Sequence, residues 1–210
     1  MVRKQTQFSL FPIFTTEYYS DDPVSFVLAF FSLAPILLVP CLFFYLLALW
    51  SHGQRHHPII NAGIFVYLPG CLLNAAVNVA LKKTFAVKRP EGFFSSSSGR
   101  HISSSSSSGL LTGGKEGMPS HHAQLMAYLI FVAFQIRLFN LGRIRLFLIS
   151  ICTLLLVSYS RVYHHYHSWD QVAAGSLVGY LFGVIFINPI AHKLIISPYK
   201  QNHISHSPDD

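Results

Sequence analysis

Five apolar stretches are each long enough to cross a lipid bilayer as a helix, and few other folds accommodate them. They lie at approximately 24–50, 59–81, 122–139, 143–160 and 170–190. A helix needs about 20 apolar residues to cross about 30 Å of hydrocarbon. Pro35, Pro40 and Pro69 should kink the first two helices without breaking them, because neighbouring helices can satisfy the freed backbone groups. The sequence therefore predicts an all-α, polytopic membrane bundle of about five transmembrane helices.

The composition and the order of segments favour one membrane-embedded domain. Of the 210 residues, 51% are hydrophobic and 11% are charged, whereas about a quarter of the residues in a soluble domain are charged. We expect an N-terminal segment at 1–23, a membrane domain at 24–190 and a C-terminal tail at 191–210. Within the domain, the Ser- and Gly-rich stretch at 93–117 is expected to be a solvated loop, because it buries too little apolar surface to offset its ordering entropy.

The remaining composition excludes several classes of function. The net charge is +7, but the Lys and Arg residues form no basic stripe or nucleic-acid module, so an anionic lipid or substrate is expected and not a nucleic acid. The three cysteines lie inside apolar stretches without paired spacing, so they indicate neither a disulfide framework nor a zinc site. No carboxylate cluster suited to magnesium accompanies the polar motifs, and we expect no metal or cofactor.

Two small-scale patterns lie inside the apolar stretches. Gly175, Gly179 and Gly183 recur every four residues, which predicts a face for close helix packing. Asn74 and Asn78 precede Lys82 at the same four-residue spacing, so the three residues share one helical face. The two amides are explained equally well by a functional role and by hydrogen bonding between helices.

Polar residues gather where four predicted helix ends meet on one side of the membrane. With five crossings, the end of the second helix, the start of the third, the end of the fourth and the start of the fifth share a face. Those places hold LKKTFAVKRP at 81–90, GMPSHHAQ at 117–124 and SRVYHHYHSWDQ at 160–171. One such cluster would be explained as a solvated loop, but three on one face predict a site.

The spacing within these clusters is that of a known family. The relevant residues are Lys82, Arg89-Pro90, Pro119-Ser120-x-His122 and Ser160-Arg161 followed after five residues by His167. They resemble the three-part signature of the lipid phosphatase and vanadium haloperoxidase superfamily, also called the type 2 phosphatidic acid phosphatases. The stretches 73–82, 117–126 and 159–172 are most similar to its dolichyl-diphosphatase branch. The similarity extends from about Thr16 to Ile190, with the Ser-rich loop as an insertion.

The resemblance implies an activity and a location. A protein of this branch hydrolyses dolichyl diphosphate, or a related polyprenyl lipid, to the monophosphate and inorganic phosphate. It would lie in the endoplasmic reticulum membrane with its active site facing the lumen, and would support lipid-carrier recycling for protein N-glycosylation. Charge does not determine the orientation, because six Lys or Arg residues fall on each side once the three in the motifs are set aside. The sequence does not indicate an oligomeric state.

The resemblance also implies a phosphate site whose residues suit the chemistry. Phosphoryl transfer depends on positioning and on stabilising negative charge, which Lys82, Arg89 and Arg161 would supply. Arg can hold two phosphate oxygens at once, whereas Lys acts as a point charge. The alternative for Lys82 and Arg89 is that they extend towards the interface from a helix end. Ser120 opens the third helix, where it would contact phosphate together with free amides, cap the helix, or do both.

Two histidines are the expected catalytic groups. His167 would attack phosphorus and form a phosphohistidine, and His122 would protonate the departing oxygen and then activate water. The superfamily has an Asp four residues after the nucleophile to orient its ring, but here that position is Gln171. Gln171 is the positional match and Asp170 is a plausible substitute, because residues three and four positions on both project near His167.

Three further histidines flank the motif positions. His121 stands where the relatives have a small residue, so it either crowds the phosphate site or supplies another donor. His164 and His165 fall where the motif sets no residue type, and we expect interfacial side chains that line the mouth of the site. Two other functions remain open: a phosphatase for phosphatidate or a sphingoid phosphate, and a catalytically silent protein or His-rich metal transporter. The transporter would use His52, His56, His57, His203 and His206.

Overall fold

The predicted helices are all present in the computed structural model, which describes residues 5–11, 14–52, 58–90, 117–136 and 142–191. The helices are α1 (Pro23–Ser51), α2 (Pro58–Phe85), α4 (His121–Ile136), α5 (Arg143–Tyr163) and α6 (Trp169–Ala191). They confirm the predicted all-α bundle, with helix ends within a few residues of those expected. Most of the predicted Ser-rich loop at 93–117 and of the tail at 191–210 lies outside the described residues.

A short hairpin precedes the bundle. Strands β1 (Gln5–Phe11) and β2 (Phe14–Tyr19) pair in antiparallel fashion, and the sequence analysis did not anticipate them. The chain then enters α1 through a side-chain cap. The Asp22 Oδ1 atom accepts hydrogen bonds from the backbone N–H groups of Val24 (3.0 Å) and Ser25 (3.2 Å). Pro23 stands in the first turn, where its missing N–H has no cost.

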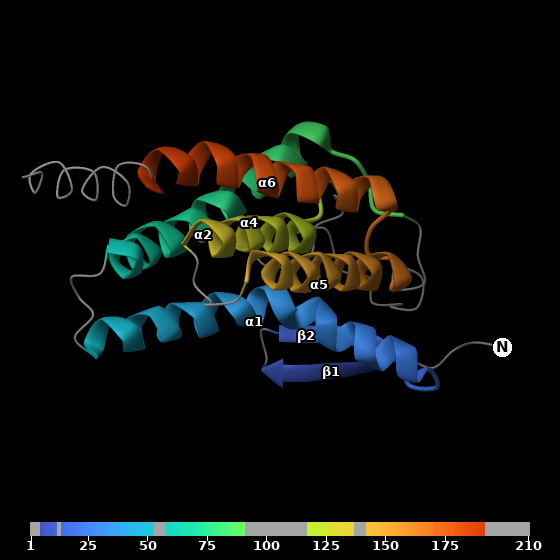
Figure 1. The fold of residues 1–210 in the computed structure, drawn as a ribbon. Coiled ribbons are helices and arrows are strands. Elements are labelled where there is room, and N and C mark those ends of the chain that lie inside the picture. Colours follow the sequence, from blue (N-terminus) through green and yellow to red (C-terminus); the bar gives the residue numbers. More distant parts are fainter. Residues whose placement is uncertain (1–4, 12–13, 53–57, 91–116, 137–141, 192–210) are drawn as a thin grey trace, which may run out of the picture.

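Helix α4 lies at the centre of the bundle and contacts all four other helices (Figure 1). Every side chain from Ala123 to Leu129 is buried. A helix that is enclosed on all sides can carry polar residues, provided that they find partners on its neighbours. This position explains why the third apolar stretch is interrupted by Gln124, which is fully buried.

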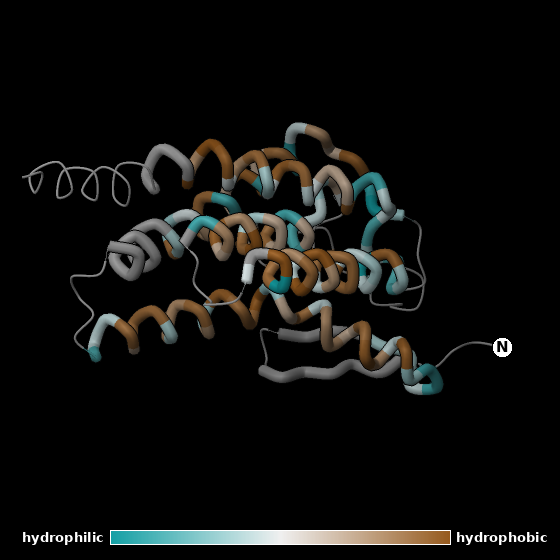
Figure 2. The backbone as a smooth tube through the Cα atoms, in the orientation of Figure 1, coloured by the Kyte–Doolittle hydropathy of each residue, from teal (hydrophilic) through white to brown (hydrophobic). Residues whose placement is uncertain are grey.

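The outer helices carry the apolar surface of a membrane protein. Within the described residues, three helices are long and apolar enough to cross a bilayer, namely Pro23–Ser51, Ile144–Tyr163 and Trp169–Ile187. Large apolar side chains project outward from these helices, including Phe44 (63% exposed), Ile144 (76%) and Ile185 (73%). Figure 2 shows apolar residues along the length of the bundle, with hydrophilic residues gathered near the helix ends. This distribution fits a protein whose sides face lipid.

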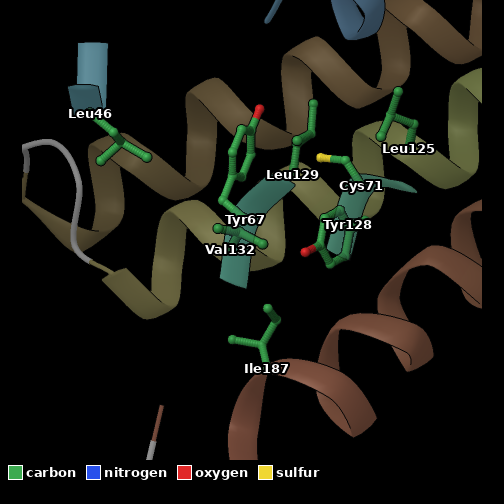
Figure 3. Close-up of a cluster of buried hydrophobic side chains, with 8 residues drawn as sticks. All are labelled: Leu46, Tyr67, Cys71, Leu125, Tyr128, Leu129, Val132 and Ile187. Carbon is green, nitrogen blue, oxygen red and sulfur yellow. The ribbon is translucent and has the colours of Figure 1, made fainter. Parts of the chain in front are cut away.

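Two packing features hold the bundle together. An apolar core forms around α4, with the buried residues Leu46, Tyr67, Cys71, Leu125, Tyr128, Leu129, Val132 and Ile187 (Figure 3). The glycine face predicted on α6 packs directly on α4. A Cβ atom at Gly175 would lie 2.4 Å from the Ser120 carbonyl oxygen, and one at Gly179 would lie 2.0 Å from that of Gln124. Only glycine allows the two backbones to come this close.

Candidate active site

The four helix ends that carry the polar motifs meet at one end of the bundle, on the right in Figure 1. Backbone hydrogen bonds join the segments between them. The Gly117 N–H donates to the Val87 carbonyl (2.7 Å), and the Ser120 N–H donates to the Gln171 carbonyl (3.0 Å). The three motifs are therefore connected through the main chain.

The third motif owes its spacing to the way α5 ends. His165 has a left-handed conformation with φ of 55°, its N–H donates to the Val162 carbonyl, and the Tyr166 N–H donates to the Arg161 carbonyl. This pattern is a Schellman motif, in which a left-handed residue closes the helix. The Arg161 carbonyl also accepts from the His167 N–H (3.2 Å). The five intervening residues thus return the chain so that the backbone of His167 touches that of Arg161.

The ring of His167 is oriented by the side chain of Gln171. The His167 Nδ1 atom lies 3.1 Å from the Gln171 Oε1 atom, which can only accept, so Nδ1 carries the proton and donates it. The amide orientation follows from its other contacts, because Oε1 also accepts from the Ser168 N–H (3.3 Å) and Nε2 donates to the Lys88 carbonyl (2.9 Å). This tautomer leaves the His167 Nε2 atom with its lone pair available.

Gln171 is the common contact of all three motifs. Its side chain reaches Lys88 in the first motif and His167 in the third, and its carbonyl accepts from Ser120 in the second. Gly117 packs against the same amide, since a Cβ atom there would lie 2.6 Å from the Gln171 Nε2 atom. Asp170, the alternative in the sequence, is exposed. The geometry favours Gln171 as the residue that orients the ring.

Three basic side chains surround this histidine. Lys82, Arg89 and Arg161 all interact electrostatically with His167. Arg161 is only 8% exposed, and its guanidinium lies over the ring of Tyr166, with Cζ 4.2 Å from the ring centroid. The Nε atoms of Arg89 and Arg161 are buried without a hydrogen-bond partner. Buried cationic donors of this kind favour binding of an anion that supplies acceptors.

The start of α4 adds further donors. Ser120 is fully buried and its Oγ atom has no partner, so its side chain makes no capping bond to the helix. The Nε2 atom of His121 is likewise buried without a partner. The rings of His121 and His122 lie 6.3 Å apart, and His122 interacts electrostatically with Arg161, His167 and Lys82. The structure therefore brings every predicted motif residue into one region.

A polar clamp one turn deeper holds this helix start against α2. The Asn78 Nδ2 atom donates to the Gln124 Oε1 atom (2.7 Å) and to the Pro119 carbonyl (3.3 Å). The Gln124 Nε2 atom donates to the carbonyl and to the Oδ1 atom of Asn74, both at 2.9 Å. All three amides are buried. Of the two explanations for the asparagines, the structure supports hydrogen bonding between helices, which also fixes the loop before Ser120.

The prediction for His164 is wrong, whereas His165 is exposed as expected. His164 has no exposed surface, because its Nδ1 atom donates to the Ser160 carbonyl (2.8 Å) and its Nε2 atom lies 3.0 Å from the Ser25 Oγ atom. It therefore lies inside the bundle and does not line the mouth of the site. No local pattern indicates this contact, because the partner on α1 is 139 residues away along the chain.

Electrostatics keep the nucleophile candidate neutral. Burial lowers the pKa of His167 to about 3, the positive charges of Arg161, Arg89 and Lys82 contribute in the same direction, and the hydrogen bond with Gln171 opposes them. A neutral imidazole can act as a nucleophile, whereas an imidazolium cannot. Anionic phosphate beside the ring would compensate the three positive charges as it binds.

Comparison with known proteins identifies the fold family. Residues 63–193 match the PAP2 superfamily. The chain belongs to the PAP2 superfamily. This segment contains most of α2 and all of α4, α5 and α6, with all three motifs, whereas the hairpin and α1 precede it. No solved structure gave a significant match.

Several named relatives of this PAP2 chain share one description. Dolichyldiphosphatase of Saccharomyces cerevisiae is 34% identical over 180 residues, which cover 80% of this chain and 65% of that protein. Dolichyldiphosphatase 1 of Mus musculus is 32% identical over 194 residues, which cover 87% and 71%. Dolichyldiphosphatase 1 of Homo sapiens is 30% identical over 180 residues, which cover 80% and 66%. The chain thus spans roughly two thirds of the length of these relatives.

Several residues that build this PAP2 site could not be found from motif spacing. Gly117, the Lys88 carbonyl and Gln124 act through the backbone or through buried contacts, and no spacing rule indicated them. Of the histidines considered for metal transport, His52 is exposed at the end of α1. The others, at 56, 57, 203 and 206, lie outside the described residues. Among the residues that are described, no group of three or more potential ligands could hold a metal ion.

Proposed function

We propose that this PAP2 protein hydrolyses dolichyl diphosphate to dolichyl phosphate and inorganic phosphate, through a phosphohistidine at His167. The observation that carries the proposal is the fixed tautomer of this residue. Its Nδ1–H is engaged by Gln171, so its Nε2 lone pair is available among Lys82, Arg89 and Arg161. The named relatives are dolichyldiphosphatases, which supports the choice of lipid.

The reaction would proceed in two displacements. The His167 Nε2 atom attacks the terminal phosphorus, the bond from phosphorus to the bridging oxygen breaks, and His122 gives its proton to that oxygen as dolichyl phosphate departs. Water then attacks the phosphohistidine while His122 takes one of its protons, and inorganic phosphate leaves with His167 restored. The three cations and the Ser120 hydroxyl stabilise the equatorial oxygens in both steps.

The surroundings of the site suit a substrate that is anchored in lipid. Tyr159 and Trp169 are exposed at the motif end of α5 and α6, with their ring centroids 6.5 Å apart. Aromatic side chains of this kind gather at membrane interfaces. The polyprenyl tail of the substrate would stay in the bilayer while its phosphates reach the cation cage formed by Lys82, Arg89 and Arg161. We further propose that the protein lies in the endoplasmic reticulum membrane with this end in the lumen, where it supports lipid-carrier recycling for N-glycosylation.

The preference for a diphosphate has a candidate residue in His121. The terminal phosphate would be held by the three cations and Ser120, whereas His122 would protonate the bridging oxygen. His121 lies beside His122, and its buried Nε2 atom has no partner in the protein. An unsatisfied buried nitrogen costs about 1–3 kcal/mol, which a hydrogen bond to the second phosphate would recover. His121 would then be a substrate-binding residue and not an obstruction.

A lipid panel and trapping of the intermediate test the function. Purified protein in detergent should release phosphate from dolichyl diphosphate with a kcat/KM at least tenfold above that for phosphatidate or a sphingoid phosphate. Lipid labelled on its terminal phosphate should leave label on wild-type protein but not on His167→Ala, and His122→Ala should lose at least a thousandfold in turnover. His121→Ser should lose about tenfold on the diphosphate and less than twofold on dolichyl phosphate.

Each competing function has its own outcome in these experiments. Equal or faster hydrolysis of phosphatidate or a sphingoid phosphate would make the protein a phosphatase of another lipid. Full activity in either histidine variant would overturn the assigned roles. Metal flux without phosphate release would favour the transporter, and neither activity would indicate a catalytically silent protein. Accessibility labelling of a cysteine introduced into the Ser-rich stretch should report the lumenal side, and cytosolic labelling would contradict the orientation.

A further inference from the structure

The loop between α5 and α6, which carries His167 and which we call the nucleophile loop, is attached to a part of the chain that precedes the segment matched to the PAP2 superfamily. Five residues make this attachment, which we name the α1–α5 clasp: Tyr19 at the end of β2, Asp22 and Ser25 at the start of α1, and Tyr163 and His164 at the end of α5. The matched segment begins at residue 63. The clasp therefore joins the nucleophile loop to residues that the family motifs do not include.

The centre of the clasp is a hydrogen bond whose direction is defined. The His164 Nδ1 atom lies 2.8 Å from the Ser160 carbonyl, which can only accept, so Nδ1 carries the proton. Burial lowers the pKa of His164, in keeping with a neutral ring whose Nε2 atom accepts. The Ser25 hydroxyl therefore donates to His164 Nε2 (3.0 Å), while its oxygen accepts from the Tyr19 N–H (2.9 Å).

Further contacts on both sides reinforce this bond. Tyr19 stacks on His164 with ring centroids 6.5 Å apart and an interplanar angle of 17°. The Tyr163 hydroxyl donates to the Asp22 Oδ2 atom, and the Oδ1 atom of the same carboxylate caps α1. Ser25 and His164 have no exposed surface. A satisfied, buried polar network of this kind restricts the groups it joins to one arrangement.

The clasp acts on the residues next to the chemistry. Ser160, which accepts from His164, immediately precedes Arg161. His164 itself opens the turn that brings the His167 N–H onto the Arg161 carbonyl. A shift of His164 would therefore move both Arg161 and His167, whereas Lys82, Arg89 and Ser120 stand on other segments and would stay in place.

We propose that Ser25 and His164 are positioning residues, which hold the His167 ring at the angle needed for attack without touching the substrate. The inference rests on the proposed phosphoryl chemistry at His167. Losing the clasp should impair steps that need a bond to His167 more than simple binding of an anion, because much of the cation cage is built elsewhere. A misplacement of about 1 Å can cost up to a hundredfold in rate.

Two anions separate positioning from binding in the purified full chain. Orthovanadate takes a fifth bond from a nucleophilic atom, so its affinity depends on the aim of His167, whereas inorganic phosphate needs only the cage. Ser25→Ala should weaken vanadate binding and lower kcat by about tenfold each, the effect of losing one buried hydrogen bond. Phosphate affinity and KM should change by a clearly smaller factor, because Arg161 is the one cation of the three that loss of the clasp displaces. His164→Gln, whose amide oxygen can accept from Ser25, should recover part of the loss that His164→Phe shows.

A matched serine supplies the control. Ser32 is also buried on α1, and its hydroxyl donates to the Ala29 carbonyl of its own helix (2.7 Å). Ser32→Ala should leave vanadate affinity within twofold of wild type. Unchanged vanadate affinity in Ser25→Ala, or an equal loss for vanadate and phosphate, would overturn the proposal. A double variant, Ser25→Ala with His164→Phe, that is much worse than His164→Phe alone would also contradict it. A wild-type protein that neither binds vanadate nor releases phosphate would instead refute the proposed function.

Discussion

The amide of Gln171 serves this site in a way that a carboxylate would not. An amide has one accepting end and one donating end, and here the first meets the His167 Nδ1–H while the second meets the Lys88 carbonyl. A carboxylate would direct an acceptor at that carbonyl, so both groups would be left without a proton between them. The difference from the superfamily pattern is therefore matched by a partner in the first motif. The amide carries no negative charge to stabilise an imidazolium, so it does not offset the effect of the nearby cations, which lower the pKa of His167.

The low pKa of His167 predicts how the free energy of unfolding depends on pH in the wild type and in His167→Gln. The unfolded ring binds protons below about pH 6.5, whereas the folded ring binds them only near pH 3. Between these values the unfolded state holds more protons, so His167 lowers the free energy of unfolding as the pH falls. His167→Gln removes this effect. As the pH falls from 7.5 to 5, the free energy of unfolding of the variant should rise by about 2 kcal/mol relative to that of the wild type. Thermal unfolding of both proteins in detergent measures it, and a difference that does not vary with pH would contradict it.

Among the contacts between helices, the packing of α6 on α4 bears most directly on the site, because it places Gly175 against Ser120. A methyl group at Gly175 would meet the Ser120 carbonyl at 2.4 Å, in a backbone that cannot rotate away as a side chain can. Gly175→Ala should therefore separate the two helices, lower kcat by at least tenfold and reduce stability by about 1–3 kcal/mol. Gly142 offers a control, because a Cβ atom there has nothing within 4 Å. Gly142→Ala should match wild type in both assays, and equal losses in the two variants would rule out the packing explanation.

The sequence predicted the positions of the helices well, but it did not predict the hairpin or the polar contacts between helices. Apolar length and the glycine repeat are local properties, so α1, α2, α4, α5, α6 and the packing face of α6 could be found from spacing alone. The hairpin before α1 lacked a comparable pattern. The clamp between Asn78 and Gln124 joins residues that are 46 positions apart, and the alternation of polar and apolar residues within one helix does not identify a partner on another.

At the scale of the whole molecule, the two tryptophans should mark the two membrane surfaces. Trp50 lies near the end of α1 and Trp169 opens α6 beside the motifs, so they stand at opposite ends of the bundle (Figure 1). Trp50→Phe and Trp169→Phe each leave one fluorophore, because the chain has only 2 tryptophans. In vesicles, lipids with bromine near the headgroup should quench each one more strongly than lipids with bromine near the chain ends. Stronger quenching of Trp169 by deep bromines would place the motif end below the interface.

For the site as a whole, the sequence predicted which residues come together but not the hydrogen bonds that connect them. Arg161 and His167 could be paired from motif spacing, yet the Schellman turn that closes the loop between them uses a histidine at the left-handed position, where glycine is the usual signal. The inward placement of His164 was missed for the opposite reason, since a polar residue after a membrane helix is expected to face water. The placement of His164 is set by its contact with Ser25 on α1, which lies far away along the chain.

The central position of α4 has a consequence for how the protein is made. The side chain of Gln124, in the first turn of this helix, is satisfied by polar groups of Asn74 and Asn78 on α2. The glycines that accommodate the other side of α4 belong to α6, which follows α2 and α4 along the chain. The packing around the segment bearing His122 therefore cannot be completed until α6 has been synthesised.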